Sequence, residues 1–175
     1  MLYDRVIFID NGSTGTIGCV SSYEPMFEHT PTISEQDYTK RRKNVTRLDV
    51  TRFTELLVRM LDGRASSRTM VVMERPMINP QRFTASISAA RMCEAELVAI
   101  ELLGLPHMFV DSKDWQRGLL PSSGHKGTTS ANLKKESADI GSRMYPQFKD
   151  MISKHGDADG ILGAYAMYRR LNMGA

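Results

Sequence analysis

Two short apolar runs in this chain each end in an acidic residue, and this pattern restricts the folds open to the chain. Residues 6–9 are β-branched and aromatic and end in Asp10, and the continuous apolar run 69–73 ends in Glu74. Runs of this length and composition predict buried strands. If the two strands are neighbours in one sheet, both carboxylates emerge at the same edge. Because like charges this close repel unless a cation lies between them, the pattern favours a divalent-metal site.

The remaining elements predict a mixed sheet with helices on both faces. Strands are expected at 6–9, 14–22, 26–33, 69–73 and 107–110. Helices are expected from a cap at Asp49 or Thr51 to a stop at Gly63, then at 83–103, 112–119, 131–144 and 158–171, with a Gly/Ser/Thr loop at 121–130. A meander followed by alternating strands and helices is typical of an α/β sheet covered on both sides. The small side chains at the start of the 83–103 helix favour close packing or a subunit interface.

Length and composition set the outer limits. The 175 residues predict one domain, 1–175, and the 23 Lys and Arg against 20 Asp and Glu give a net charge of +3, which supports only a modest preference for anions. Cys19 and Cys93 form neither a disulfide framework nor a zinc motif, which favours a reducing, cytoplasmic setting. We expect a protein that is neither secreted nor anchored in a membrane, because no signal-peptide core and no long apolar stretch occurs.

A longer set of motifs surrounds the two acids. It comprises VIFIDNGSTGTIG, VVMERP, LGLPHMFVDSKDWQRGLLP, LKKESA and HGDADGILGAYA. In order and spacing, over almost the whole chain, these motifs resemble phage-type RuvC-like Holliday-junction resolvases of the ribonuclease H-like superfamily. The resemblance implies an α/β fold with a mixed five-stranded sheet of order 3-2-1-4-5, in which strand 2 is antiparallel. It also implies a homodimer and a Mg²⁺-dependent endonuclease that makes paired nicks in four-way DNA junctions.

The resemblance also assigns the candidate catalytic and metal-binding residues. Asp10 matches the central aspartate that bridges two metal ions, Glu74 the glutamate after strand four, and Asp159 the final aspartate. The fourth ligand is open between Asp157 and His155: His155 shares a face with Asp159 if one helix includes both, and Asp157 can act as a helix cap or reach the metal from the preceding loop. Because Mg²⁺ prefers oxygen, Asp157 is favoured. Two Mg²⁺ ions are expected, with Mn²⁺ as the alternative.

Basic residues concentrate in one segment. Five cations lie within eight residues, namely Lys40, Arg41, Arg42, Lys43 and Arg47. Such a patch suits contacts to DNA phosphates, which need charge but no base readout, although a solvated basic loop has the same composition. Phe83 is expected either to stack on a base near the junction centre or to act as a hydrophobic staple at its helix start. The other residues expected at the DNA are Arg75, Arg82, Lys113, Lys134 and Lys135.

Three other functions are compatible with parts of this pattern. The segment 10–18 also resembles the first phosphate loop of the actin, Hsp70 and sugar-kinase ATPases, but those proteins need two lobes and a second such loop. A non-catalytic DNA-binding subunit is disfavoured because unneeded carboxylates would repel phosphates. A nuclease acting on broader branched DNA or on RNA–DNA hybrids remains compatible with the acids, since one fold hosts many substrates. What the resemblance implies is therefore a junction-resolving nuclease that hydrolyses phosphodiesters symmetrically with a divalent metal.

Overall fold

The computed structural model describes residues 3–38, 40, 42–63 and 66–174. Its main sheet is built from β1 (Arg5–Ile9), β2 (Thr16–Ser21), β3 (Met26–His29), β6 (Thr69–Glu74) and β7 (His107–Val110). The strand order is β3-β2-β1-β6-β7. Strand β2 is antiparallel to β1 and β3, while β1, β6 and β7 are parallel to one another. This confirms the predicted order 3-2-1-4-5 and the ribonuclease H-like α/β fold, with β6 and β7 as the predicted fourth and fifth strands.

A two-stranded hairpin outside the main sheet was not predicted. It consists of β4 (Thr32–Gln36) and β5 (Asn44–Leu48), which pair with each other. The expected single strand over 26–33 is therefore wrong: β3 ends at His29 and β4 begins beyond Pro31. Proline lacks the N–H that a continuous ladder needs, so the chain leaves the main sheet at this point.

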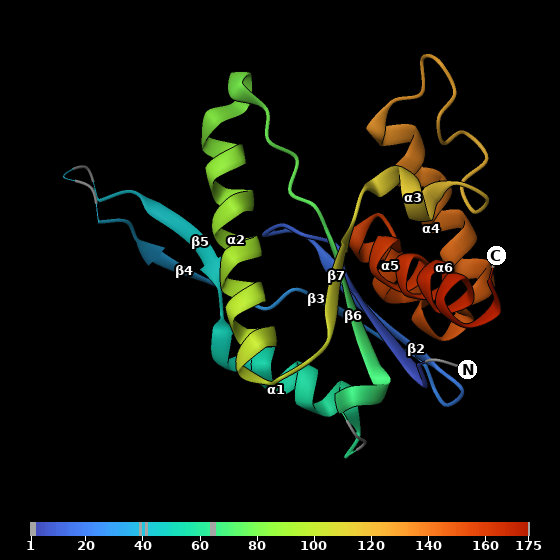
Figure 1. The fold of residues 1–175 in the computed structure, drawn as a ribbon. Helices are drawn as coiled ribbons and strands as arrows, with labels where there is room; N and C mark the ends of the chain where they lie inside the picture. Colours follow the sequence, from blue (N-terminus) through green and yellow to red (C-terminus); the bar gives the residue numbers. More distant parts are fainter. Residues whose placement is uncertain (1–2, 39, 41, 64–65, 175) are drawn as a thin grey trace.

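Helices cover both faces of the main sheet (Figure 1). On one side lie α1 (Val50–Leu61) and α2 (Phe83–Leu102); on the other lie α3 (Ser112–Gln116), α4 (Ser130–Met144), α5 (Lys149–His155) and α6 (Asp159–Met173). Short 3₁₀ turns occupy Ser66–Arg68, Pro80–Arg82 and Pro146–Phe148. Of the two expected caps of the first helix, Asp49 is the one used, since its side chain accepts a hydrogen bond from the backbone N–H of Arg52. Helix α3 ends earlier than expected, and α5 was not predicted.

The two faces of the sheet bury separate cores because strand side chains alternate in direction. From β1, Ile7 and Ile9 point toward α1 and α2 and pack in a cluster with Phe53. Val6 and Phe8 point the other way, into the cluster that includes the apolar face of α6. These four side chains of β1 are fully buried, so the strand is fixed from both sides and holds the residue that follows it, Asp10, in a defined place.

Glycines allow the backbone of α6 to pack directly against the backbone of β2. A Cβ added at Gly18 would lie 2.3 Å from the carbonyl oxygen of Gly160, and one at Gly163 would lie 2.5 Å from the Phe8 ring. The N–H of Gly160 donates a 3.0 Å hydrogen bond to the hydroxyl of Thr16. This close approach fixes the N-terminal end of α6 beside the carboxyl end of β1. No helix in the described part of the chain has the length and apolar character needed to cross a membrane.

Candidate active site

An open cleft of about 770 Å³ lies at the carboxyl ends of the parallel strands. Asp10 follows β1, Glu74 ends β6 and Asp159 begins α6, and all three line this cleft. Neighbouring parallel strands end at the same edge of a sheet, which is why acids 64 residues apart in sequence meet here. The structure thus brings together three of the four acids that the sequence analysis singled out, and the fourth, Asp157, lies directly beside them.

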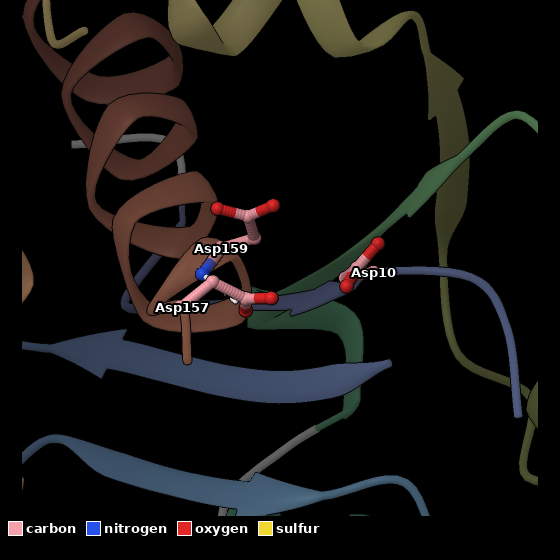
Figure 2. A group of neighbouring side chains, drawn as sticks. All are labelled: Asp10, Asp157 and Asp159. Carbon is pink, nitrogen blue, oxygen red and sulfur yellow. Dashed lines mark hydrogen bonds between the residues drawn. The ribbon is translucent and has the colours of Figure 1, made fainter. Parts of the chain in front are cut away.

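Asp10, Asp157 and Asp159 form the tightest group of acids. Each offers one carboxylate oxygen, and these oxygens all lie within 4.8 Å of one another. Figure 2 shows Asp157 and Asp159 at the N-terminal end of α6, facing Asp10 beyond the end of β1. Asp157 is fully buried, while the other two are partly accessible from the cleft. Three convergent oxygen ligands with an open side are a donor set that suits a hard divalent cation.

The electrostatics of the group support the same fit. Burial raises the pKa of Asp10 well above its ordinary value, and the charges of Asp159, Glu74 and Asp157 raise it further, while Lys134 opposes them. Burial and then the charge of Asp157 raise the pKa of Asp159 to about 7. These carboxylates therefore repel one another in the protein alone. A divalent cation among them would relieve that repulsion.

Glu74 lies on the wall of the cleft, outside the tight group. Its Oε2 accepts a 2.8 Å hydrogen bond from Nε1 of Trp115, and its Oε1 accepts one from the hydroxyl of Ser112. Trp115 is itself buried edge-on against Phe8, with ring centroids 5.7 Å apart. The orientation of the Glu74 carboxylate is thus set by α3. Sequence reasoning missed both donors, although the DSKDW motif after the last predicted strand carried the signal.

Among the four acids at the site, Asp157 is the one that forms an ion pair with a lysine. Its Oδ2 lies 2.6 Å from Nζ of Lys134, and its Oδ1 lies 3.5 Å from Nε2 of His155. His155 ends α5, and Gly156 follows in a left-handed conformation with φ of 99°. Because α5 and α6 are separate helices, the condition under which His155 would share a helical face with Asp159 is not met. Burial lowers the pKa of His155, and its ring lies against that of His29 at 4.7 Å.

A buried serine orders the acidic turn. The hydroxyl of Ser137, on α4, donates to Oδ1 of Asp159 and accepts a 3.0 Å hydrogen bond from the N–H of Ala158. The N–H of Asp159 in turn lies 3.4 Å from Oδ1 of Asp157. Sequence reasoning noted the LKKESA motif for its lysines and missed its serine. Glu74, Asp157 and Asp159 are therefore each held by at least one specific side-chain neighbour.

The predicted DNA-binding residues fall in two regions. Lys40, Arg42 and Lys43 are exposed at the turn of the β4–β5 hairpin, and Arg41 lies outside the described residues. Arg47, on β5, forms a 2.8 Å ion pair with Glu35 and a 3.0 Å hydrogen bond with the hydroxyl of Tyr38. Its guanidinium is thus already engaged within the hairpin.

The second region borders the cleft. Arg75 lines it but forms a 2.9 Å ion pair with Asp111, while Lys113 and Lys134 line it with exposed side chains. Arg82 and Lys135 are exposed, on Pro80–Arg82 and α4 respectively. Phe83 begins α2 with 70% of its surface exposed, so it is not packed as a hydrophobic staple.

Comparison with known proteins agrees with this architecture. No protein-family model matches the chain, and no curated protein sequence does. Among solved structures, Thermus thermophilus RuvC in complex with a Holliday junction substrate superposes with a TM-score of 0.58 at 19% identity, over 97% of both chains. A second Thermus thermophilus RuvC structure gives a TM-score of 0.52 at 17% identity, over 97% of this chain and 96% of the other. This chain therefore has the RuvC-like version of the ribonuclease H-like fold.

Proposed function

We propose that this protein is a structure-specific endonuclease that resolves four-way and other branched DNA junctions by symmetric, divalent-metal-dependent hydrolysis of phosphodiester bonds. One observation carries the proposal: Asp10, Asp157 and Asp159 converge beside Glu74 at one open cleft. The RuvC of similar fold was solved with a Holliday junction, which supports branched DNA as the substrate class. A bound metal would supply an activated water as the nucleophile, so no covalent protein–DNA intermediate would be expected.

The acids would hold the metal. Asp10, Asp157 and Asp159 supply the shared oxygen ligands, and Glu74 supplies a further one from the wall of the cleft. Mg²⁺ is the proposed ion, two per site, with Mn²⁺ as the alternative; such ions supply an activated water and stabilise the leaving oxygen. The protein's own contribution is orientation, because Ser112 and Trp115 fix Glu74 and Ser137 fixes Asp159. Lys134 compensates the buried charge of Asp157.

The DNA would be held mainly by its backbone. At the hairpin turn the proposed phosphate contacts are Lys40, Arg41, Arg42 and Lys43, with Arg47 bracing the hairpin. In the lining of the cleft they are Arg75, Lys113 and Lys134, and the exposed Arg82 and Lys135 are proposed as further contacts outside that lining. Phosphate contacts select shape rather than sequence, as junction recognition requires. The exposed ring of Phe83 is the proposed residue to stack on a base at the junction centre.

A homodimer would supply two such sites. Helix α2 carries a stripe of exposed apolar side chains at Ile87, Val98 and Leu102. Exposed apolar side chains on a helix often mark a protein–protein interface. The small side chains on the first half of α2 would allow a helix of the second subunit to approach closely. A twofold axis would present two active sites to two equivalent phosphates of a four-way junction. Sedimentation of the wild type and of Val98→Glu tests this, with a dimer and a monomer as the expected results.

The central experiment compares substrates and an active-site variant. Labelled four-way junction, duplex, flap and RNA–DNA hybrid are incubated with the wild type and Asp10→Asn, with Mg²⁺ or with chelator. We expect symmetric nicks in the junction by the wild type with Mg²⁺, and binding without cutting by Asp10→Asn. The control Asp139→Asn removes an exposed acid from α4 and should cut normally.

Other results of this experiment would reject the proposed function or favour one of the alternative functions. Equal cutting by Asp10→Asn and the wild type would reject the catalytic assignment. Cutting of flaps or hybrids at the same rate as junctions would assign a broader nuclease. Junction binding by a wild type that never cuts would assign a non-catalytic DNA-binding subunit.

A further inference from the structure

A second, smaller cavity of about 230 Å³ lies between α3 and α6. Helix α3 divides it from the catalytic cleft: Ser112 and Lys113 line the cleft, whereas Trp115 and, directly after the helix, Arg117 line the smaller cavity. From α6 the lining includes Arg169 and Arg170. We call this cavity the arginine groove.

The arginine groove carries positive charge that the chain itself does not neutralise. Arg117, Arg169 and Arg170 are all exposed, and no acid among the described residues forms an ion pair with any of them. Asp114, which also lines the groove, is engaged at the start of α3, where its carboxylate accepts a hydrogen bond from the N–H of Asp111. Three guanidinium groups around one hollow form an anion-binding surface.

The chemistry of the groove fits phosphate better than a base. Arg169 lies over the ring of Tyr165, 5.8 Å from its centroid, so the aromatic face in the groove is already covered. What remains for a ligand is charge and hydrogen-bond donors rather than a stacking platform. The planar fork of arginine matches two phosphate oxygens at once, whereas lysine offers only a point charge.

The position of the groove relates it to the cleft. Helix α6 begins with Asp159 in the cleft and carries Arg169 and Arg170 about three turns later. At a rise of about 1.5 Å per residue, the arginines lie about 15 Å further along the helix axis. Phosphates of one duplex strand are spaced by about 3.4 Å along the DNA axis, so for a DNA arm that runs parallel to α6 this distance corresponds to about four to five base pairs.

We propose that the arginine groove is a second phosphate-binding surface, which holds the backbone of the DNA arm about four to five base pairs from the scissile phosphate. The proposal rests on the proposed function and adds Arg117, Arg169 and Arg170 to the DNA-binding surface. Because these residues touch none of the acids of the site, the groove contributes affinity and orientation of the arm rather than bond cleavage.

The test measures salt-dependent binding in the absence of divalent metal, where no cutting occurs. Affinity for a four-way junction is determined at several salt concentrations for the wild type, Arg169→Gln and the triple variant with Gln at positions 117, 169 and 170. Each lost phosphate contact should lower the slope of log K against log salt by about 0.9, so we expect a loss of about 1 for the single variant and about 3 for the triple variant. The matched control is Arg52→Gln, an exposed arginine on α1 on the other side of the sheet, which should keep the wild-type slope.

A second measurement needs no substitution in the protein. Junctions with neutral methylphosphonate linkages four to five base pairs from the cleavage position should bind the wild type with the reduced slope. The same linkages should have little further effect on the triple variant, because its contacts to them are already lost. Arg169→Lys retains the positive charge, so it should recover most of the salt dependence of binding that Arg169→Gln loses.

The results separate the two proposals. A wild-type slope in the triple variant, or no effect of the neutral linkages on the wild type, would overturn the arginine groove alone. If the triple variant kept the wild-type slope but no longer bound polyglutamate, the groove would instead be a binding site for an acidic protein partner. A wild type that binds no junction at all would overturn the proposed function and, with it, the groove.

Discussion

The indole Nε1 of Trp115 donates a 2.8 Å hydrogen bond to Oε2 of Glu74. Trp115 lies on the helix after β7, and Glu74 ends the neighbouring strand β6, so the bond joins two elements across the wall of the cleft. The indole cannot turn, because it is buried edge-on against Phe8. A rigid donor of this kind sets the direction in which the carboxylate presents its remaining lone pairs.

Trp115→Phe keeps a ring in the core and removes the donor. We expect junction cleavage to fall about 10- to 100-fold with DNA affinity unchanged, which is the usual effect of losing a residue that orients a metal ligand. Ser112→Ala, which removes the other donor to Glu74, should act in the same direction. Ser130→Ala changes a serine that lines the same cleft and should cleave normally. Full activity in both Trp115→Phe and Ser112→Ala would show that Glu74 needs no orientation.

Lys134→Met removes the cation that compensates the fully buried Asp157. Removing one partner of a buried ion pair leaves the other charge unpaired in the interior, which destabilises the fold. Because Lys134 is half exposed, solvent screens the pair, and we expect a loss of only about 1–3 kcal/mol in the free energy of unfolding. Added Mg²⁺ should restore stability more in Lys134→Met than in the wild type, since the metal replaces the missing charge. Thermal unfolding with Mg²⁺ or chelator measures this, with Lys135→Met as the neighbouring exposed control. Equal Mg²⁺ effects in all three proteins would speak against a metal at Asp157.

Gly18→Ala forces α6 away from β2, because the new Cβ would lie 2.3 Å from the carbonyl oxygen of Gly160. We expect a destabilisation of about 1–3 kcal/mol by urea unfolding, the usual range for overpacking. Cleavage should fall as well, because the shift separates Asp159 from Asp10. Gly124→Ala serves as the control, since its Cβ meets no atom within 4 Å and only the left-handed φ of +84° is strained. Equal stability and activity in the two variants would contradict a tight contact between α6 and β2.

Glu96 provides a pH-dependent prediction away from the site. This residue of α2 is fully buried, neither carboxyl oxygen has a hydrogen-bond partner among the described residues, and burial raises its pKa from 4.5 to about 8. The folded protein therefore favours the protonated form, so this stabilisation is complete below pH 4.5 and is lost as the pH rises toward about 8. The expected slope is about 1.4 kcal/mol per pH unit.

Glu96→Gln should remove that slope. Asp10 and Asp159 contribute in the same direction, so the difference between the wild type and the variant isolates Glu96. Urea unfolding at several pH values between 5 and 8 measures it. Glu94→Gln, an exposed acid on the same helix, is the control. A variant whose stability keeps the pH dependence of the wild type would show that Glu96 does not contribute to it.

The sheet and the principal acids could be predicted because their signals are local. Apolar runs mark β1 and β6, and Asp10 and Glu74 stand at their ends, so strand adjacency was enough to bring the two carboxylates to one edge. The assignment of Asp159 came from the resemblance of the motif HGDADGILGAYA to the family's final aspartate. These features depend on residues close in sequence or on one pairing rule.

The features that were missed depend on contacts between distant segments. The β4–β5 hairpin carries mostly exposed side chains, so no burial pattern marked it. Helix α5 has seven residues and is held by the burial of Ile152 in the core rather than by its own periodicity. The hydroxyl of Ser137 reaches Asp159 across 22 positions, which no local motif encodes.

The β4–β5 hairpin is hydrogen-bonded to no strand of the main sheet within the described chain. Its tip can therefore lengthen, shorten or change its charge without altering the register of the strands that carry the carboxylates. Under the proposed function, the residues that contact DNA and the residues that cleave it could then change independently during evolution. Exchange of the β4–β5 hairpin between related proteins should therefore transfer substrate preference and leave the catalytic residues in place.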